Sequence, residues 1–144
     1  MALCLILLLT FYPAAGNCQP ELTVVATAYC LPGHTTSGPR TSEIRGGCIA
    51  LSRPLAQDLG LKSGPGQYDY RFGAVVEIEG VGRFTFADLM PPRWTHYRVA
   101  IWFPTLKQCR VFGIRRCRLR LIEPRRLNFR PWLISQSGRN AWHS

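Results

Sequence analysis

The chain has 144 residues, a length that favours one domain over several. Its 18 Lys and Arg side chains outnumber its 8 Asp and Glu side chains, which gives a net charge of +10. Such a surface attracts polyanions, namely nucleic acid, acidic glycans, anionic lipid or wall polymers. The charge is uneven, because ten Lys and Arg lie between Lys107 and Ser144 against the single Glu123. A solvated basic face without one particular partner is the alternative.

The first residues have the pattern of a secretory signal. An apolar run from Ala2 to Tyr12 is too short to span a bilayer, and Ala14 and Gly16 place small residues at a cleavage spacing. No basic residue precedes the run, which departs from the usual signal pattern. We therefore assign residues 1–16 to a signal peptide, and expect a secreted, periplasmic or cell-envelope protein without a membrane span.

Short alternating segments separated by Gly and Pro follow in the next part of the chain. They predict strands at residues 21–30, 48–52, 74–80, 82–89, 99–103 and 115–123. Short helical segments are expected at Pro54–Leu59 and Pro104–Phe112. Six short strands with one or two short helices predict a mostly β fold, a small closed barrel spanning residues 21–123, since closure removes exposed sheet edges.

The last predicted strand and the residues after it are basic. Arg116, Arg118 and Arg120 alternate with apolar residues, so we expect an arginine face that binds anionic polymer. Residues 124–144 combine basic and aromatic side chains without a clear period, and we assign them to a basic C-terminal tail.

Five cysteines follow the predicted cleavage site, and an odd number cannot pair completely. In an oxidising compartment we expect at least one disulfide. We favour the local pairings Cys30 with Cys48 and Cys109 with Cys117, which leave Cys18 free or cross-linked. Spacing does not determine the connectivity, and buried unpaired cysteines are the alternative. Because no C-x-x-C pair or His cluster at ligand spacing occurs, we expect no metal site and no cofactor.

Asp88 ends an apolar alternating strand and is the candidate catalytic residue. Phe84, Phe86 and Asp88 are two residues apart, so a regular strand places them on one face. With the phenylalanines in the core, we expect Asp88 to point inward at the mouth of the barrel. Burial there raises a carboxyl pKa and suits a general acid or base. The alternative is an aspartate that caps the following turn.

Arg93 and Trp94 follow in the next loop and are candidate substrate-binding residues. Trp offers a stacking surface for a sugar ring, and Arg offers a clamp for an anion. The alternative is that Trp94 plugs the barrel end and Arg93 is solvated. His96 has no nucleophile at a readable spacing, so we treat it as a loop residue.

A series of ordered motifs covers about residues 23–122: TAYC, TTSG, CIALS, IEGVGRF, ADLMPPRW, VAIWF and FGIRR. In this order they resemble the three-aspartate (3D) domain of secreted bacterial cell-wall proteins. The resemblance implies a double-psi β-barrel, similar to the barrel of membrane-bound lytic transglycosylase A. It also implies peptidoglycan or another anionic wall glycan as partner. On the matching motifs, it adds Tyr29, Ser37 and Ser52 to the candidate substrate-binding residues.

The family implies lytic cleavage of peptidoglycan. An aspartate protonates the glycosidic oxygen and then helps the muramic 6-hydroxyl to attack the anomeric carbon, which gives a 1,6-anhydro sugar. Asp88 matches the second family aspartate, whereas Ser52 and Ala100 replace the first and the third. Loss of a positioned acid or base costs a factor of about 10² to 10⁴ in rate. Whether this protein is an enzyme is therefore left open.

Three functions follow from these patterns. The first is a secreted, peptidoglycan-associated protein that binds glycan with weak or lost catalysis. The second is an active lytic transglycosylase that uses Asp88. The third is a non-catalytic polyanion-binding or expansin-like module, for which nucleic acid is the less favoured partner. The sequence does not indicate the oligomeric state.

Overall fold

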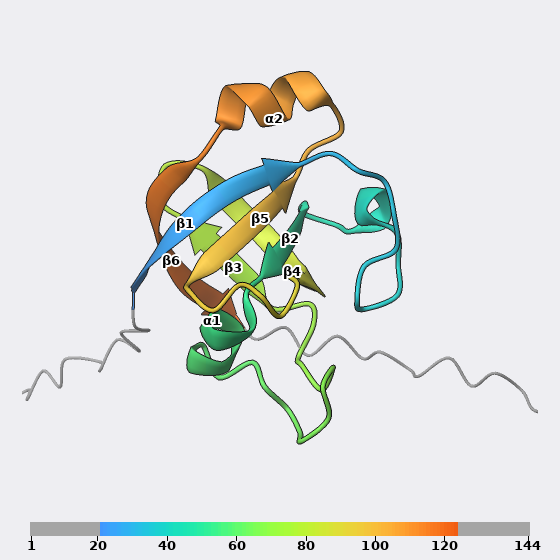
Figure 1. The fold of residues 1–144 in the computed structure, drawn as a ribbon, viewed down its shortest axis with the longest axis vertical. Coiled ribbons are helices and arrows are strands. Elements are labelled where there is room, and N and C mark those ends of the chain that lie inside the picture. The colour runs from blue at the N-terminus through green and yellow to red at the C-terminus, as the bar shows by residue number, and fades with distance from the viewer. Residues whose placement is uncertain (1–20, 124–144) are drawn as a thin grey trace, which may run out of the picture.

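The computed structural model of this protein describes residues 21–123. Its strands are β1 (Leu22–Tyr29), β2 (Cys48–Leu51), β3 (Val75–Ile78), β4 (Gly82–Leu89), β5 (Arg98–Trp102) and β6 (Arg115–Glu123). They close into one barrel in the order β1-β5-β2-β4-β3-β6 (Figure 1). β1 is parallel to β5 and β2 to β4, and the other neighbouring pairs are antiparallel. The expected mostly β fold with a closed six-stranded barrel is confirmed.

Two short α-helices accompany the barrel, as expected. α1 (Arg53–Asp58) follows β2, and α2 (Leu106–Phe112) connects β5 to β6. Figure 1 shows them at opposite ends of the barrel, with α2 above the end of β1. A short 3₁₀ helix, η1 (Thr41–Glu43), lies in the connection from β1 to β2 and has no counterpart among the predicted elements.

The ends of α2 have clear local causes. The Thr105 hydroxyl accepts a hydrogen bond from the backbone N–H of Gln108 at 3.2 Å, so Thr105 is the N-cap. Pro104 therefore precedes the N-cap, and the helix begins at Leu106, two residues later than expected. Gly113 ends the helix with a φ of 67°, a left-handed conformation that glycine adopts without steric cost.

The barrel interior is filled around Phe86 of β4, which is fully buried. Its ring centroid lies 6.4 Å from that of Tyr70 in an edge-on contact and 5.0 Å from that of Phe72. Strand residues that join this core are Val24, Ala26, Ile49, Leu51, Val76, Ile78, Leu89, Val99, Ile101, Leu119 and Leu121. The alternation predicted for β6 is present, since Leu119 and Leu121 are buried between exposed arginines.

A register shift interrupts the pairing of β4 with β2. Phe86 lies opposite Ile49, but the next residue of β2 lies opposite Asp88, so Ala87 is an extra residue in β4. Phe86 and Leu89 both pack in the core although they are three positions apart. An extra residue of this kind, a β-bulge, exchanges the two faces of a strand beyond it.

The bulge changes the direction of the candidate catalytic side chain. Because Leu89 faces the core, its neighbour Asp88 faces the outside of the barrel. The expectation that Asp88 shares the inward face of Phe84 and Phe86 is therefore wrong. Side-chain alternation predicts the face of a residue only in a regular strand, and β4 is irregular at Ala87.

The predicted signal peptide (residues 1–16), Cys18 and the predicted tail (residues 124–144) lie outside the described residues. Within residues 21–123, no helix is long and apolar enough to cross a membrane.

The position of Phe86 leads to a stability prediction. Phe86→Ala removes a large ring from a closely packed core, and we expect the free energy of unfolding to fall by about 3–5 kcal/mol. Leu31→Ala is the control, because Leu31 is 76% exposed and its truncation should change stability by less than about 0.5 kcal/mol. Urea denaturation followed by circular dichroism measures both. Equal losses in the two variants would contradict this view of the core.

Candidate functional site

Four residues from neighbouring strands form a line across the outside of the barrel. Thr27 of β1 lies opposite Ala100 of β5, Ala100 opposite Ala50 of β2, and Ala50 opposite Asp88 of β4. Their strand neighbours pack in or against the core: Ala26, Ala28, Ile49, Leu51, Leu89, Val99 and Ile101. We call these four residues the Asp88 row. Figure 1 shows the strands that carry it side by side.

Asp88 holds the loop between β1 and β2 (residues 30–47). Its Oδ1 atom accepts hydrogen bonds from the Thr36 backbone N–H at 2.9 Å and from the Thr36 hydroxyl at 2.5 Å. The backbone N–H of Leu89 also donates to Oδ1, at 2.9 Å. A further bond from the Ser37 N–H to the Ala87 carbonyl, at 3.1 Å, fastens the loop to β4. Asp88 is thus a local cap, as its alternative interpretation proposed, and also a tether between distant segments.

The two oxygens of this carboxylate differ in their surroundings. Oδ1 accepts three hydrogen bonds, whereas Oδ2 accepts none from residues 21–123. Asp88 is partly exposed. One oxygen is therefore committed to structure, and the other remains able to meet a ligand or exchange a proton.

Tyr29 and Cys48 form a buried pair on the same side of the sheet. The Tyr29 hydroxyl lies 3.6 Å from the Cys48 sulfur. Burial is the main cause that raises the pKa of Tyr29, and the neighbouring Cys48 adds to it. Burial also raises the pKa of Cys48 to about 11, and the charge of Asp88 acts in the same direction. Both groups are protonated at neutral pH, so neither is a nucleophile there.

An arginine-aromatic cluster lies beside the row. The Arg98 guanidinium lies 4.1 Å from the centroid of the Trp94 ring, and that of Arg93 lies 5.6 Å from it. These are cation-π distances. Arg98 occupies the outer face of β5, two residues before Ala100. It therefore places the predicted pair Arg93 and Trp94 next to the Asp88 row.

Two buried donors lie on either side of Ala100. The Arg98 Nε and the Trp102 Nε1 atoms are buried and have no hydrogen-bond partner among the described residues. Both side chains are two residues from Ala100 and share its outward face. Buried donors without a partner are uncommon, and each calls for an acceptor from water or a ligand.

Ser37 and Ser52, the two serines in the predicted set, have structural contacts. Ser52 is fully buried, and its hydroxyl accepts a hydrogen bond from the Arg98 N–H at 3.1 Å. The Ser37 hydroxyl lies 2.9 Å from that of Thr35 within the loop. Ser52 thus links the end of β2 to the start of β5, and the structure does not present it to a ligand.

The four candidate disulfide cysteines are unpaired thiols in the described part of the chain. Neither predicted pair is formed there. Cys48 contacts Tyr29, and the Cys109 thiol is a neighbour of the Cys30 thiol. Cys117 packs against the barrel core from β6.

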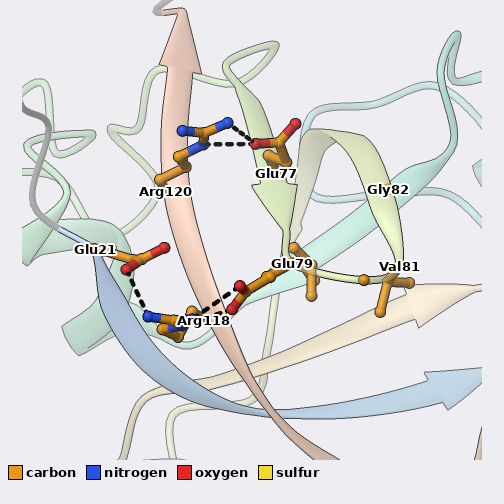
Figure 2. Close-up of a pocket in the computed structure, with 9 residues that line it drawn as sticks. Glu21, Glu77, Glu79, Val81, Gly82, Arg118 and Arg120 are labelled. Carbon is orange, nitrogen blue, oxygen red and sulfur yellow. Dashed lines mark hydrogen bonds and ion pairs between the residues drawn. The ribbon is translucent and has the colours of Figure 1, made fainter.

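The expected arginine face of β6 is largely occupied by carboxylates. Arg118 pairs with Glu79 at 2.6 Å and with Glu21 at 3.4 Å, and Arg120 pairs with Glu77. Figure 2 shows these ion pairs. They line a pocket of about 460 Å³ at the β3–β4 turn, at the far end of β4 from Asp88. Two of the three arginines of this face are therefore not available to a polyanion without loss of an existing ion pair.

Sequence reasoning missed two residues of the site, Thr36 and Arg98. Thr36 lies within the TTSG motif, in which the family resemblance indicates only the adjacent Ser37. Arg98 precedes the VAIWF motif and carried no signal of its own. Its role depends on Trp94, which folding brings to the start of β5.

Comparisons with known proteins add a fold neighbour. No family model matches the chain, and no curated protein matches it. Among solved structures, the chain is similar to apo expansin from Clavibacter michiganensis, with a TM-score of 0.49 and 14% identity. The match covers 72% of this chain and 51% of that one, so the chain spans about half the length of that protein. The resemblance to the 3D domain stays a prediction.

The described residues form no metal-binding cluster. Residues 21–123 contain no group of three or more His, Cys, Asp or Glu side chains placed to hold a metal ion.

The contact between Thr36 and Asp88 can be measured as a coupling energy. We expect Thr36→Val to lower the free energy of unfolding by about 1.5–3 kcal/mol, because it removes a hydrogen bond to a charged group. In an Asp88→Asn background the same substitution should cost at least about 1 kcal/mol less. Thr23→Val is the control, since Thr23 is exposed on β1. Additive effects of the two substitutions would contradict the tether.

The raised pKa of Cys48 predicts slow alkylation. With a pKa of about 11, only about 0.1% of this thiol is ionised at pH 8, and the thiolate is the reactive form. We expect iodoacetamide at pH 8 to leave Cys48 unmodified in the folded protein and to modify it fully in urea. Peptide mass spectrometry measures the extent. Rapid modification of Cys48 in the folded state would show that this thiol is neither buried nor protonated.

Proposed function

We propose that this protein is a secreted or cell-envelope module that binds peptidoglycan or another anionic wall glycan, with weak or lost catalysis. The observation that carries the proposal is the composition of the Asp88 row. It contains one carboxylate, and alanines occupy the two positions between Asp88 and Thr27. The row therefore has a single group for proton transfer.

The other aspartates do not supply the missing group. Asp58 accepts a hydrogen bond from the Tyr97 hydroxyl, and Asp69 accepts one from the Gly66 N–H at 2.6 Å within its own loop. Neither is in the row. Lytic cleavage needs a group that first protonates the leaving oxygen and then accepts a proton from the attacking hydroxyl. Asp88 alone would have to do both while one of its oxygens holds the loop.

The side chains around Trp94 and Arg98 suit the binding of a ligand better than catalysis. The Trp94 ring lies beside the Arg98 guanidinium. It offers a flat surface of the kind on which sugar rings stack. The partly exposed Arg98 beside this ring suits a ligand with hydroxyl and carboxylate acceptors. A wall glycan has both groups. The net charge of +10 favours its approach.

An active lytic transglycosylase is the second candidate, and one observation favours it. Oδ2 of Asp88 accepts no hydrogen bond from the described residues, so it is available to a glycosidic oxygen. A shifted sugar register would be needed, because the third family position is Ala100.

Release of anhydro-muropeptides from sacculi separates these two candidates. We expect near-background release by the wild type and a rise of at least tenfold in Ala100→Asp, which adds a carboxylate to the row on β5, two strands from Asp88. Asp88→Asn should abolish the activity of either version, because it removes the transferable proton. Mass spectrometry measures the products, with circular dichroism as the check of fold.

Strong wild-type release that is lost in Asp88→Asn would instead establish the enzyme. Strong release that survives this substitution would place the active site elsewhere.

Binding to sacculi tests the surface independently of catalysis. We expect Trp94→Ala to weaken co-sedimentation about fivefold, since stacking on an aromatic ring contributes about 1 kcal/mol. Leu106→Ala is the control, because Leu106 is exposed on α2 at the other end of the barrel. Retention should fall as salt rises from 50 mM to 1 M, since exposed charges are screened.

Equal binding by both variants would remove Trp94 from the site. Tighter binding of short single-stranded DNA than of sacculus fragments, at the same salt, would favour the polyanion-binding alternative.

A further inference from the structure

The end of β1 and the end of β5 lie side by side at the end of the barrel covered by α2. Tyr29 is opposite Trp102 in the parallel pair, and the Phe103 N–H donates to the Tyr29 carbonyl at 2.9 Å. Cys30 follows Tyr29 directly. It therefore leaves the barrel beside Phe103, where the chain turns toward α2.

α2 lies at the same end of the barrel as Cys30 and Phe103. The helix packs against β1, and the Phe112 ring lies 5.5 Å from that of Phe103. Cys109 is three residues before Phe112 and so shares its face of the helix. The neighbouring groups that act on the pKa of the Cys109 thiol are the Cys30 thiol, which raises it, and the Phe103 backbone, which lowers it. Two segments 79 positions apart in the sequence thus present their sulfurs to each other.

We propose that Cys30 and Cys109 form a disulfide that fastens α2 to the start of the loop between β1 and β2. This pairing differs from both local pairings expected from the sequence. It does not depend on the proposed function. A low-molecular-weight disulfide such as oxidised glutathione is the oxidant. One sulfur–sulfur bond forms between the cysteines, the oxidant's bond breaks, and two molecules of the reduced thiol leave with the two protons.

The two thiols have different parts in this exchange. Burial and the hydrogen bond with Cys30 raise the pKa of Cys109. Its thiolate is therefore scarce, and we assign the first attack on the oxidant to Cys30. The Cys109 thiolate then attacks the Cys30 sulfur of the mixed disulfide and releases the second reduced thiol.

The other two described cysteines are poorly placed to compete. Cys48 is fully buried, with its sulfur against the Tyr29 hydroxyl. Cys117 packs against the barrel core. Cys30, Cys109 and Cys117 are all partly exposed, so Cys117 is set apart by its place. On β6 it lies opposite Val24, six residues before Cys30 in the chain.

The bridge has a consequence for the Asp88 row. Cys30 is the first residue of the loop that carries Thr36, and Thr36 donates two hydrogen bonds to Asp88. A covalent anchor at Cys30 would hold the start of this loop against α2. It also closes a long segment of the unfolded chain, and long closed segments gain most from a cross-link.

The experiment compares reduced protein with protein incubated with oxidised glutathione. Non-reducing digestion and tandem mass spectrometry should identify one peptide pair that joins Cys30 to Cys109 and should distinguish Cys30 from Cys18. We expect oxidation to raise the thermal midpoint by about 10 °C or more. This rise should vanish in Cys30→Ser, in Cys109→Ser and in the double variant.

Cys117→Ser is the matched control, because it removes the partner that local pairing would give to Cys109. It should keep both the peptide pair and the rise in midpoint. Comparison of all variants in the reduced state shows whether the serines alone disturb folding. A bridge from Cys109 to Cys117 or from Cys30 to Cys48 overturns the inference, as does the absence of any bridge. A Cys30–Cys109 bridge that leaves the midpoint unchanged overturns the claim that it fastens α2.

Discussion

The one-residue bulge in β4 determines on which side of the barrel Asp88 lies. Without Ala87 as an extra residue, the strand would send its carboxylate into an interior filled by Phe86 and its neighbours. An unpaired charge there would be costly. With the bulge, Asp88 reaches the outer face, where Thr36 and the Leu89 N–H meet it. The path of the loop of residues 30–47 over this face of the sheet therefore depends on the position of Asp88.

In this arrangement the two carboxylate oxygens of Asp88 have different surroundings. Oδ1 is a structural acceptor that holds a long connection, while Oδ2 is directed to no group in the described chain. In a row with a second carboxylate, structure and proton transfer could be divided between residues. Here Ala50 and Ala100 occupy the positions between Asp88 and Thr27. The row therefore has one carboxylate for both roles.

Net charge is a poor guide to where a polyanion would bind on this molecule. The strand with the densest arginines, β6, is matched by the glutamates of β3 and of the turn that follows it. Arg98, in contrast, lies over the Trp94 ring with its Nε buried and without a partner. An arginine that stacks on an aromatic ring keeps its in-plane donors for a ligand. Local pairing, more than the number of charges, decides which arginines are available.

The sequence by itself determined the class of fold and the order of its elements. Strand alternation, turn residues and the Gly113 stop are local signals, since each depends on side-chain direction or backbone freedom within a few residues. It also indicated Asp88, Arg93 and Trp94 as candidates. Only the tertiary structure decided that Asp88 faces outward, that Ser52 is buried, and that Cys109 meets Cys30. These outcomes depend on the register of parallel strands and on the packing of α2, which join residues far apart in the chain and leave no local mark.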